Sequence, residues 1–563
     1  MLTLNPGFVL IIASFLILAA PRFARPWLIA AAAIVAFTVL LGREFGAATA
    51  VAQMGLPVVF LSLDALNRIF GIAVLITLMT LAPYSAARRH GVEDAAILLL
   101  AGGALSALFV GDLVSFVAAF TLAGLASAWV VLASPLEGSN PAGARLLIWQ
   151  GIEGLLLLVG VAFHLVSNQD LALTRLNAGT ISGAFILSAL LIRTGAPLAH
   201  VWFKDAVAYA SPLGAAASAA FTTLIGVYAL ARMFPSEPAL TWIGGAMIVL
   251  GAVYAVAEPN LRRAAAYAQT AQTGVCVALI GVGSPIALAG AEGHAFAVMI
   301  AFAALQMLLG GVVRQRGDAR MEQIDGLAGD MPLTAVLLVV SGLAVSAAPG
   351  TSLFATQTVA LDAFGHWDWT PLWALTMALP AVIFAKFVLR IAVAAYRPRI
   401  ALAARNEAPF VMSLGISLAL FFCITVGLAP TWLYDLMPAD LSFDPFAVHN
   451  VASQAQLLGV GGCVYLLLHV SAARLTAASP ARLLDADAFY SGPLAKVAGR
   501  LGRWGLTVYD TVQSAMEGLA KGAGRLGLRW IAYWDRPFSQ VWGTLAQPAA
   551  LALLLVIAFL ASA

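Results

Sequence analysis

Ionisable residues stand inside long apolar segments of this chain, where charges are rare. Arg193 lies in ISGAFILSALLIRTGAPLAH, Glu153 in LLIWQGIEGLLLLVGVAF and Lys386 in LWALTMALPAVIFAKFVLRIAV. A charge in a membrane span is costly, so it usually faces protein or a water-filled cavity and often marks a path for ions or protons. These residues therefore predict ion or proton movement as the chemistry of the chain.

Each charged residue has an expected role. An arginine inside a span requires a carboxylate, and Glu153 stands at similar depth on the preceding segment, so we expect the two to pair. Arginine keeps its proton, so Arg193 either tunes the proton affinity of Glu153 or only joins two helices. Lys386 can lose its proton when buried and is a second relay candidate. His294 either carries protons or serves packing and capping.

Arg193 precedes a predicted interruption of its helix. Pro197 removes a helix hydrogen bond and Gly195 loosens the same turn, so these two residues form the expected broken-helix hinge. Transporter sites often lie at such breaks because the freed backbone groups face a cavity. A simple proline kink is the alternative. Residues 349–369, apolar but interrupted by Gly and Pro, are a second short or re-entrant piece, and Asp112 is expected to cap a helix start.

The composition is that of an all-α polytopic membrane protein. Of 563 residues, 62% are hydrophobic and 10% are charged, and the mean hydropathy is +0.94. Soluble domains carry about 25% charged residues. With one span for every 20 or so apolar residues, we predict about 14–16 transmembrane helices. The net charge of +3 excludes a nucleic-acid partner. The sequence shows no haem pair, flavin or metal signature, so no cofactor and no stand-alone enzyme are expected.

The distribution of Lys and Arg sets the expected topology. Most of these residues fall in alternate loops when the N-terminus is placed outside, which satisfies the positive-inside rule with both termini on the outer side. A bacterial inner (cytoplasmic) membrane is the default location. Residues 474–545 mix Leu, Val and Trp with Arg and Lys, a composition typical of interfacial amphipathic helices. This segment is either an anchor for a last helix or a lateral helix that contacts a neighbouring subunit.

Several sequence blocks, in order, resemble the family of antiporter-like membrane subunits. The stretch HVWFKDAVAYASPLGAAASAAFTTLIGVYALARM is similar to the family's H-x-W-x-x-D-A, P-x-x-x-x-A and G-V-Y-x-x-x-R signature. The matching residues are His200, Trp202, Asp205, Ala206, Pro212, Gly226, Val227, Tyr228 and Arg232. Further blocks are NLRRAAAYAQTAQTG, GHAFAVMIAF, DGLAGDMPLTAVLLVVSGLAVSAAPGTSLFATQ and LLDADAFYSGPLAKVAGRLG. The family comprises the proton-pumping membrane subunits of respiratory complex I and the D-type subunits of multisubunit monovalent cation/proton antiporters.

The resemblance implies two inverted five-helix repeats, each with a broken helix, and a hydrophilic axis along the membrane plane. It divides the chain into N-terminal helices (1–92), a first repeat (93–234), a second repeat (235–400), C-terminal helices (401–473), interfacial or lateral helices (474–545) and a final helix (546–563). It also implies other membrane subunits of an antiporter or complex I-like assembly as partners, with protons or monovalent cations as cargo.

The sequence departs from the family at its charged positions. Thr121 stands where the family has a glutamate, and Arg193 where it has the broken-helix lysine. Three further lysine positions hold Leu224, Val298 and Gln357. A neutral threonine or leucine cannot hold a relay proton, although water can bridge gaps.

Three functions follow as hypotheses. The first is an antiporter-like subunit that moves protons or cations by an altered relay, itself not an enzyme but open to a place in a proton-translocating oxidoreductase. The relay candidates are then Glu153, Arg193, His294, Lys386 and His200. The second is a non-conducting scaffold subunit of such a complex. The third is the membrane half of a two-component inorganic-carbon uptake system with a soluble partner.

Overall fold

The computed structural model describes residues 4–46, 48–53, 56–87, 90–168, 171–365, 367–398, 407–439, 441 and 443–472. The interfacial helices predicted at 474–545 and the final span predicted at 546–563 lie outside the described residues. All statements about the fold refer to the described part of the chain.

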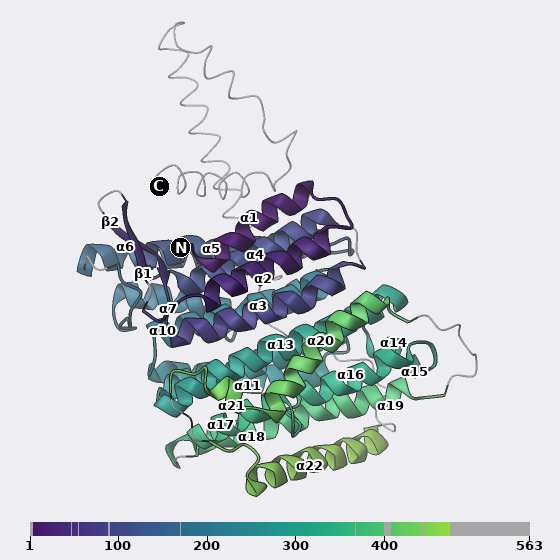
Figure 1. The fold of residues 1–563 in the computed structure, drawn as a ribbon. Coiled ribbons are helices and arrows are strands. Elements are labelled where there is room, and N and C mark those ends of the chain that lie inside the picture. Colours follow the sequence, from purple (N-terminus) through teal and green to yellow (C-terminus); the bar gives the residue numbers. More distant parts are fainter. Residues whose placement is uncertain are drawn as a thin grey trace, which may run out of the picture. The chain divides into compact units, whose positions relative to one another are not determined.

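The chain is an all-α polytopic integral membrane protein, as its composition predicts (Figure 1). Ten described helices are long and apolar enough to cross a membrane. They are α3 (Ala65–Ser85), α4 (Gly91–Phe109), α5 (Leu113–Leu132), α6 (Ser139–Asn168), the pair α9 (Pro212–Phe221) and α10 (Thr223–Met233), α11 (Pro238–Ala257), α12 (Leu261–Val282), α13 (Pro285–Arg316), the run from α18 (Thr370–Phe384) to α19 (Ile391–Ala395), and α20 (Phe410–Leu428). Four shorter apolar helices accompany them: α1 (Pro6–Ala19), α2 (Arg25–Leu41), α7 (Ile181–Thr194) and α16 (Pro332–Val345).

The remaining helices are short or complete a break. They are α8 (Val201–Tyr209), α14 (Met321–Ile324), α15 (Leu327–Asp330), α17 (Ser352–Ala363), α21 (Thr431–Tyr434) and the longer α22 (Val448–Ala472). A 3-10 turn covers Trp367–Trp369, and a π-helical segment, Ala385–Arg390, joins α18 to α19. Within the described residues, α13 is the central helix. It packs against α9, α12, α16, α17, α20 and α3, and the apolar window of its span is wholly buried (Figure 1).

Two sets of five membrane passes follow one another. The first runs through α4, α5, α6, the α7/α8 pair and the α9/α10 pair, and the second through α11, α12, α13, the α16/α17 pair and α18–α19. The fourth pass is the broken one in both sets. Because five is an odd number, the second set enters the membrane from the opposite side, which makes the repeats inverted. The domain boundaries 93–234 and 235–400 stay predictions.

A β-hairpin between α2 and α3 was not expected from the sequence. Strand β1 (Ala48–Gln53) pairs antiparallel with β2 (Leu56–Ser62), with Val51 opposite Val58 and an irregularity between Thr49 and Ala50. Asp112, predicted as a helix cap, does cap α5 by accepting from Ser115 N at 2.8 Å. Its other oxygen accepts from Val59 N at 2.8 Å, so one carboxylate joins the hairpin to the start of α5.

Glycine lets helices α11 and α12 pack backbone against backbone. A Cβ on Gly244 would stand 2.3 Å from Ala278 N, and one on Gly281 would stand 2.3 Å from Thr241 N. Gly251 and Gly274, seven residues from these two glycines, make similar close approaches. Small residues at helix contacts are the main way in which membrane helices achieve tight packing, since lipid supplies no hydrophobic drive between them.

We therefore expect Gly244→Ala to loosen the α11–α12 contact. The added methyl group meets backbone atoms that cannot move by a rotamer change, so the loss of stability is about 1–3 kcal/mol, as in other overpacked cores. Thermal unfolding of the purified protein in detergent measures it. Gly151→Ala on α6 is the matched control because a Cβ there meets nothing within 4 Å. Equal melting temperatures for the two variants would contradict this account of the contact.

Candidate functional site

Arg193 and Glu153 form a fully enclosed ion pair, as the sequence predicts. Arg193 Nε lies 2.9 Å from Glu153 Oε1 and 3.0 Å from Oε2, and Arg193 Nη2 lies 2.8 Å from Oε1. Both side chains are 1% exposed. A buried charge survives only when it is paired and hydrogen-bonded, and two guanidinium nitrogens against two carboxylate oxygens satisfy this condition.

A third helix completes the surroundings of the pair. Arg193 Nη2 also donates to the backbone oxygen of Phe120 on α5 at 3.0 Å, and the guanidinium lies 4.2 Å from the centre of the Phe120 ring. Arg193 stands in the last turn of α7, where the negative end of the helix dipole favours a cation. One guanidinium group thus joins α5, α6 and α7.

Polar atoms without partners surround the pair. Both amide atoms of Gln150, one helical turn before Glu153, are buried and have no hydrogen-bond partner in the described part of the chain. The same holds for the hydroxyl of Thr121. A Cβ on Gly124 would stand 2.4 Å from Gln150 Oε1 and 2.7 Å from Arg193 Nη2, so this glycine leaves room where the amide and the guanidinium meet. Buried polar atoms of this kind usually bind water.

The helix that carries Arg193 breaks where the sequence indicates. Helix α7 ends at Thr194, and Gly195 adopts a left-handed conformation with φ of 75°. Pro197 follows within the connection, and α8 begins at Val201. The break exposes backbone oxygens, and Trp202 Nε1 on α8 donates to one of them, Ile192 O, at 2.9 Å.

His200 stands at the start of α8 and is 2% exposed. Its ring lies 6.0 Å from the ring of Tyr267 and 6.3 Å from that of Tyr254, measured between centres. Lys204, one turn further along α8, lies 5.8 Å from the Tyr267 ring. The structure therefore places His200 in an aromatic setting, on the far side of the break from Arg193.

His294 belongs to a separate polar cluster around the second broken helix. Its Nδ1 lies 3.0 Å from Thr356 Oγ1 on α17, and its Nε2 lies 3.0 Å from Gln272 Oε1 on α12. The next residue of α17, Gln357, donates to Thr376 O on α18 at 2.5 Å. Gln357 Oε1 and Thr376 Oγ1 are buried without partners among the described residues.

The second break resembles the first, because a residue with a positive φ again follows the end of the first half-helix. Helix α16 ends at Val345, and Ala347 has a positive φ of 52° before α17 begins at Ser352. Gln454 Nε2 on α22 donates to the freed oxygen of Ala347 at 2.9 Å, and Gln272 Nε2 approaches Val345 O at 3.5 Å. Residues 349–369, expected as a short or re-entrant piece, thus include the second half of a broken helix.

Lys386 occupies the π-helical segment and is 2% exposed. Its ammonium donates to Val256 O at 3.0 Å and to Glu258 O at 2.7 Å. These oxygens end helix α11, so Lys386 caps that helix. The sequence predicts Lys386 as a relay candidate, and this stays a prediction. The helix end that it caps could not be predicted, because the sequence does not show which helix lies beside it.

The positions at which the resemblance implies lost charged residues lie inside the protein. Leu224, Val298 and Gln357 are 0% exposed. Thr121 lies against α6, where a Cβ on Gly154 would stand 3.3 Å from Thr121 Oγ1. Glu153 is the residue before Gly154, so the chain has a carboxylate on α6 next to the α5 position where the family has one. Gln150 was missed by sequence reasoning, because a single amide in an apolar run gives no distinctive pattern.

Comparisons with known proteins match this polytopic architecture to antiporter-like membrane subunits. A family model described as "NADH:quinone oxidoreductase/Mrp antiporter, TM" matches residues 110–383. NADH-quinone oxidoreductase subunit N of Desulforudis audaxviator is 27% identical over 57% of this chain and 68% of its own length. The D-type subunit of the Na(+)/H(+) antiporter of Bacillus subtilis is 22% identical over 58% of this chain and 70% of its own length.

Solved structures agree on the fold. A chain of the Mrp complex from Dietzia sp. superimposes with a TM-score of 0.73 at 21% identity, and the match covers 93% of this chain. It covers 63% of that solved chain, which is therefore considerably longer. Over residues 110–383 the present chain is thus similar to the antiporter-like membrane subunits of NADH:quinone oxidoreductases and Mrp antiporters.

The buried pair makes a prediction about stability. Glu153→Gln leaves the Arg193 charge buried without a counter-ion, and breaking a buried pair in this way costs about 3–5 kcal/mol. The double variant Glu153→Gln, Arg193→Gln removes both charges and should regain much of the loss. Thermal unfolding of the single and double variants measures this difference.

The matched control is Asp325→Asn. Asp325 pairs with Arg397 at 3.5 Å, but these side chains are 43% and 52% exposed. Removal of such an exposed pair costs about 0–1 kcal/mol. If Glu153→Gln is no more destabilising than Asp325→Asn, the pair does not hold the three helices together.

Proposed function

We propose that this chain is an antiporter-like subunit of a multisubunit membrane complex, and that it moves protons or monovalent cations across the bilayer in concert with partner subunits. Similarity to this family supports the proposal, since two relatives are an antiporter subunit and a quinone oxidoreductase subunit by name. The observation that carries the proposal is the Glu153–Arg193 pair at the end of a broken helix, beside buried polar atoms that have no partner among the described residues.

Glu153 is the proton-exchanging group in this proposal. Arg193 keeps its charge at any accessible pH, so it cannot release a proton and instead holds the carboxylate in place. Thr121 occupies the family's glutamate position on α5 and lies against Gly154, so the carboxylate has moved one helix over. Gln150 and Thr121 supply polar atoms that can bind a bridging water next to Glu153.

Beyond the pair, buried neutral polar groups continue through the chain, and one of them, Gln357, stands at a position where the resemblance implies a lysine. Gln269 on α12 donates to Ala219 O at 2.6 Å, and its oxygen, like that of Gln357 on α17, has no partner among the described residues. His294 and Gln272 lie between the two second-repeat helices that frame the break. The glutamine side chains cannot carry a charge, but with His294 they can hold a line of water molecules through which protons move.

The proposal also covers the membrane, the orientation and the partners of the subunit. We place it among other membrane subunits in a bacterial inner membrane with both termini on the outer side, on the distribution of Lys and Arg. A soluble partner would be found by its co-purification with the native complex. A carbonic-anhydrase-like partner would indicate inorganic-carbon uptake instead.

The relay is tested with a variant that stays folded. Glu153→Gln combined with Arg193→Gln removes both charges together and therefore leaves no unpaired buried charge. We expect the complex, assembled and reconstituted into liposomes, to lose its proton flux, as read from a pH-sensitive dye. Glu44→Gln in the exposed α2–β1 connection is the control with an unchanged flux. Wild-type flux in the double variant would refute the relay, and absence of flux in the wild-type complex would identify a scaffold subunit.

A Gln150 variant distinguishes a role of this amide in holding water from a role in stability. Gln150→Leu removes two buried atoms that have no protein partner among the described residues, so the stability should stay unchanged or rise. If the amide holds the water that serves Glu153, proton flux should fall about tenfold, which equals about 1.4 kcal/mol on the barrier. Gln323→Leu in α14, away from the pair, controls for loss of an amide. A fall in melting temperature without a fall in flux would assign Gln150 a structural role.

A further inference from the structure

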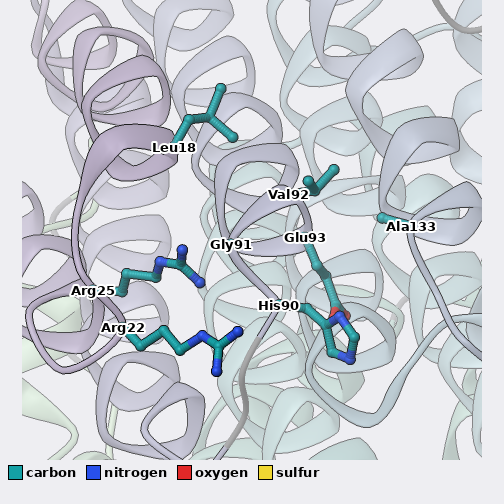
Figure 2. Close-up of a pocket in the computed structure, with 8 residues that line it drawn as sticks. All are labelled: Leu18, Arg22, Arg25, His90, Gly91, Val92, Glu93 and Ala133. Carbon is teal, nitrogen blue, oxygen red and sulfur yellow. The ribbon is translucent and has the colours of Figure 1, made fainter.

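A basic pocket lies at the end of the helix bundle opposite to the β-hairpin. It has a volume of about 250 Å³ and is lined by Leu18, Arg22, Arg25, His90, Gly91, Val92, Glu93 and Ala133 (Figure 2). The two arginines come from the connection between α1 and α2 and from the first turn of α2, and His90 and Gly91 stand at the start of α4. None of these residues takes part in the proposed relay.

The arginines are positioned for a shared anion. Arg25 Nε donates to Ala20 O at 3.2 Å, which ties its guanidinium to the end of α1. The guanidinium also lies close to Gly91 of α4, since a Cβ there would stand 2.5 Å from Arg25 Cζ. Arg22 is exposed, and both guanidinium groups extend to the same side in Figure 2.

The opposite wall does not cancel this charge. Glu93 is 1% exposed, and its Oε1 accepts a hydrogen bond from the Ser211 hydroxyl inside the protein. With two arginines against one engaged carboxylate, the lining carries a net positive charge that favours an anion.

The surface around the pocket is apolar and faces outward. On α1, Phe15, Leu16 and Leu18 are 47%, 57% and 47% exposed. Next to the arginines in sequence, Phe23 is 80% exposed and Trp27 is 75% exposed. Exposed aliphatic residues on a span contact acyl chains, and aromatic residues gather at the level of the lipid headgroups. A soluble anion would gain no binding energy from these exposed apolar side chains.

We propose that this pocket binds the phosphate of an anionic membrane phospholipid, with Arg22 and Arg25 on the phosphate and the acyl chains along α1. Basic pockets between membrane helices on the cytoplasmic side are known to hold anionic headgroups, and the positive-inside assignment places this pocket on that side. The proposal stands apart from the relay and does not depend on proton movement through Glu153.

Delipidated wild-type protein is tested with three probes: phosphatidylglycerol, phosphatidylcholine and inorganic phosphate. We expect phosphatidylglycerol to raise the melting temperature in detergent and the other two to leave it unchanged. In the double variant Arg22→Gln, Arg25→Gln the shift should disappear, and native mass spectrometry should show the loss of a retained anionic lipid. Arg22→Gln alone, at an exposed side chain, should reduce the shift if the double variant does not fold.

The matched control removes two positive charges elsewhere. Arg43 follows α2 at its other end, and Arg175 is exposed in the connection between α6 and α7. The double variant Arg43→Gln, Arg175→Gln should keep the full shift with phosphatidylglycerol. An equal shift in the Arg22, Arg25 variant would overturn the proposal. If inorganic phosphate raises the melting temperature as much as phosphatidylglycerol does, the pocket binds a soluble anion. If phosphatidylcholine does so, the charge of the headgroup plays no role.

Discussion

Because the bilayer interior holds no water, polar groups inside this structure must find protein partners, and the Arg193–Glu153 pair shows this requirement most clearly. A guanidinium in that setting must have its donors directed at acceptors, and here the acceptors come from α6 and from the backbone of α5. The three helices are thereby held at one point. The same constraint explains why the charge stands in the last turn of α7, where the helix dipole stabilises it further.

The breaks in α7/α8 and α16/α17 obey the same constraint. Each frees backbone oxygens that a lipid environment could not satisfy, and in each a side chain from another element supplies the donor: Trp202 for Ile192 O and Gln454 for Ala347 O. Lys386 does this for the end of α11. A polar residue within a span can thus cap a helix end, and its hydrogen-bond partners are needed to recognise this role.

This explains how far sequence reasoning reached. The pairing of Arg193 with Glu153 could be predicted because one cation and one carboxylate stood at matching depths, and the break could be predicted because Gly195 and Pro197 act on their own turn. The role of Gln150 could not be predicted, because it depends on the structure. The sequence does not show that both amide atoms are buried without a hydrogen-bond partner among the described residues. The β-hairpin was missed because its short strands look like a connection between two helices.

His294 shows what a relay without lysines requires. Its ring nitrogens face Gln272 Oε1 and Thr356 Oγ1, and a neutral imidazole donates from one nitrogen while accepting at the other. With the amide oxygen of Gln272 toward it, Nε2 must carry the proton. A proton that enters at Nδ1 and leaves from Nε2 reverses this tautomer, so the Gln272 amide must then turn its nitrogen toward the ring and Thr356 must rotate its hydroxyl. A proton path through His294 would therefore require neutral dipoles to reorient after each transfer, whereas the site proposed in the first half of the chain contains a carboxylate, Glu153.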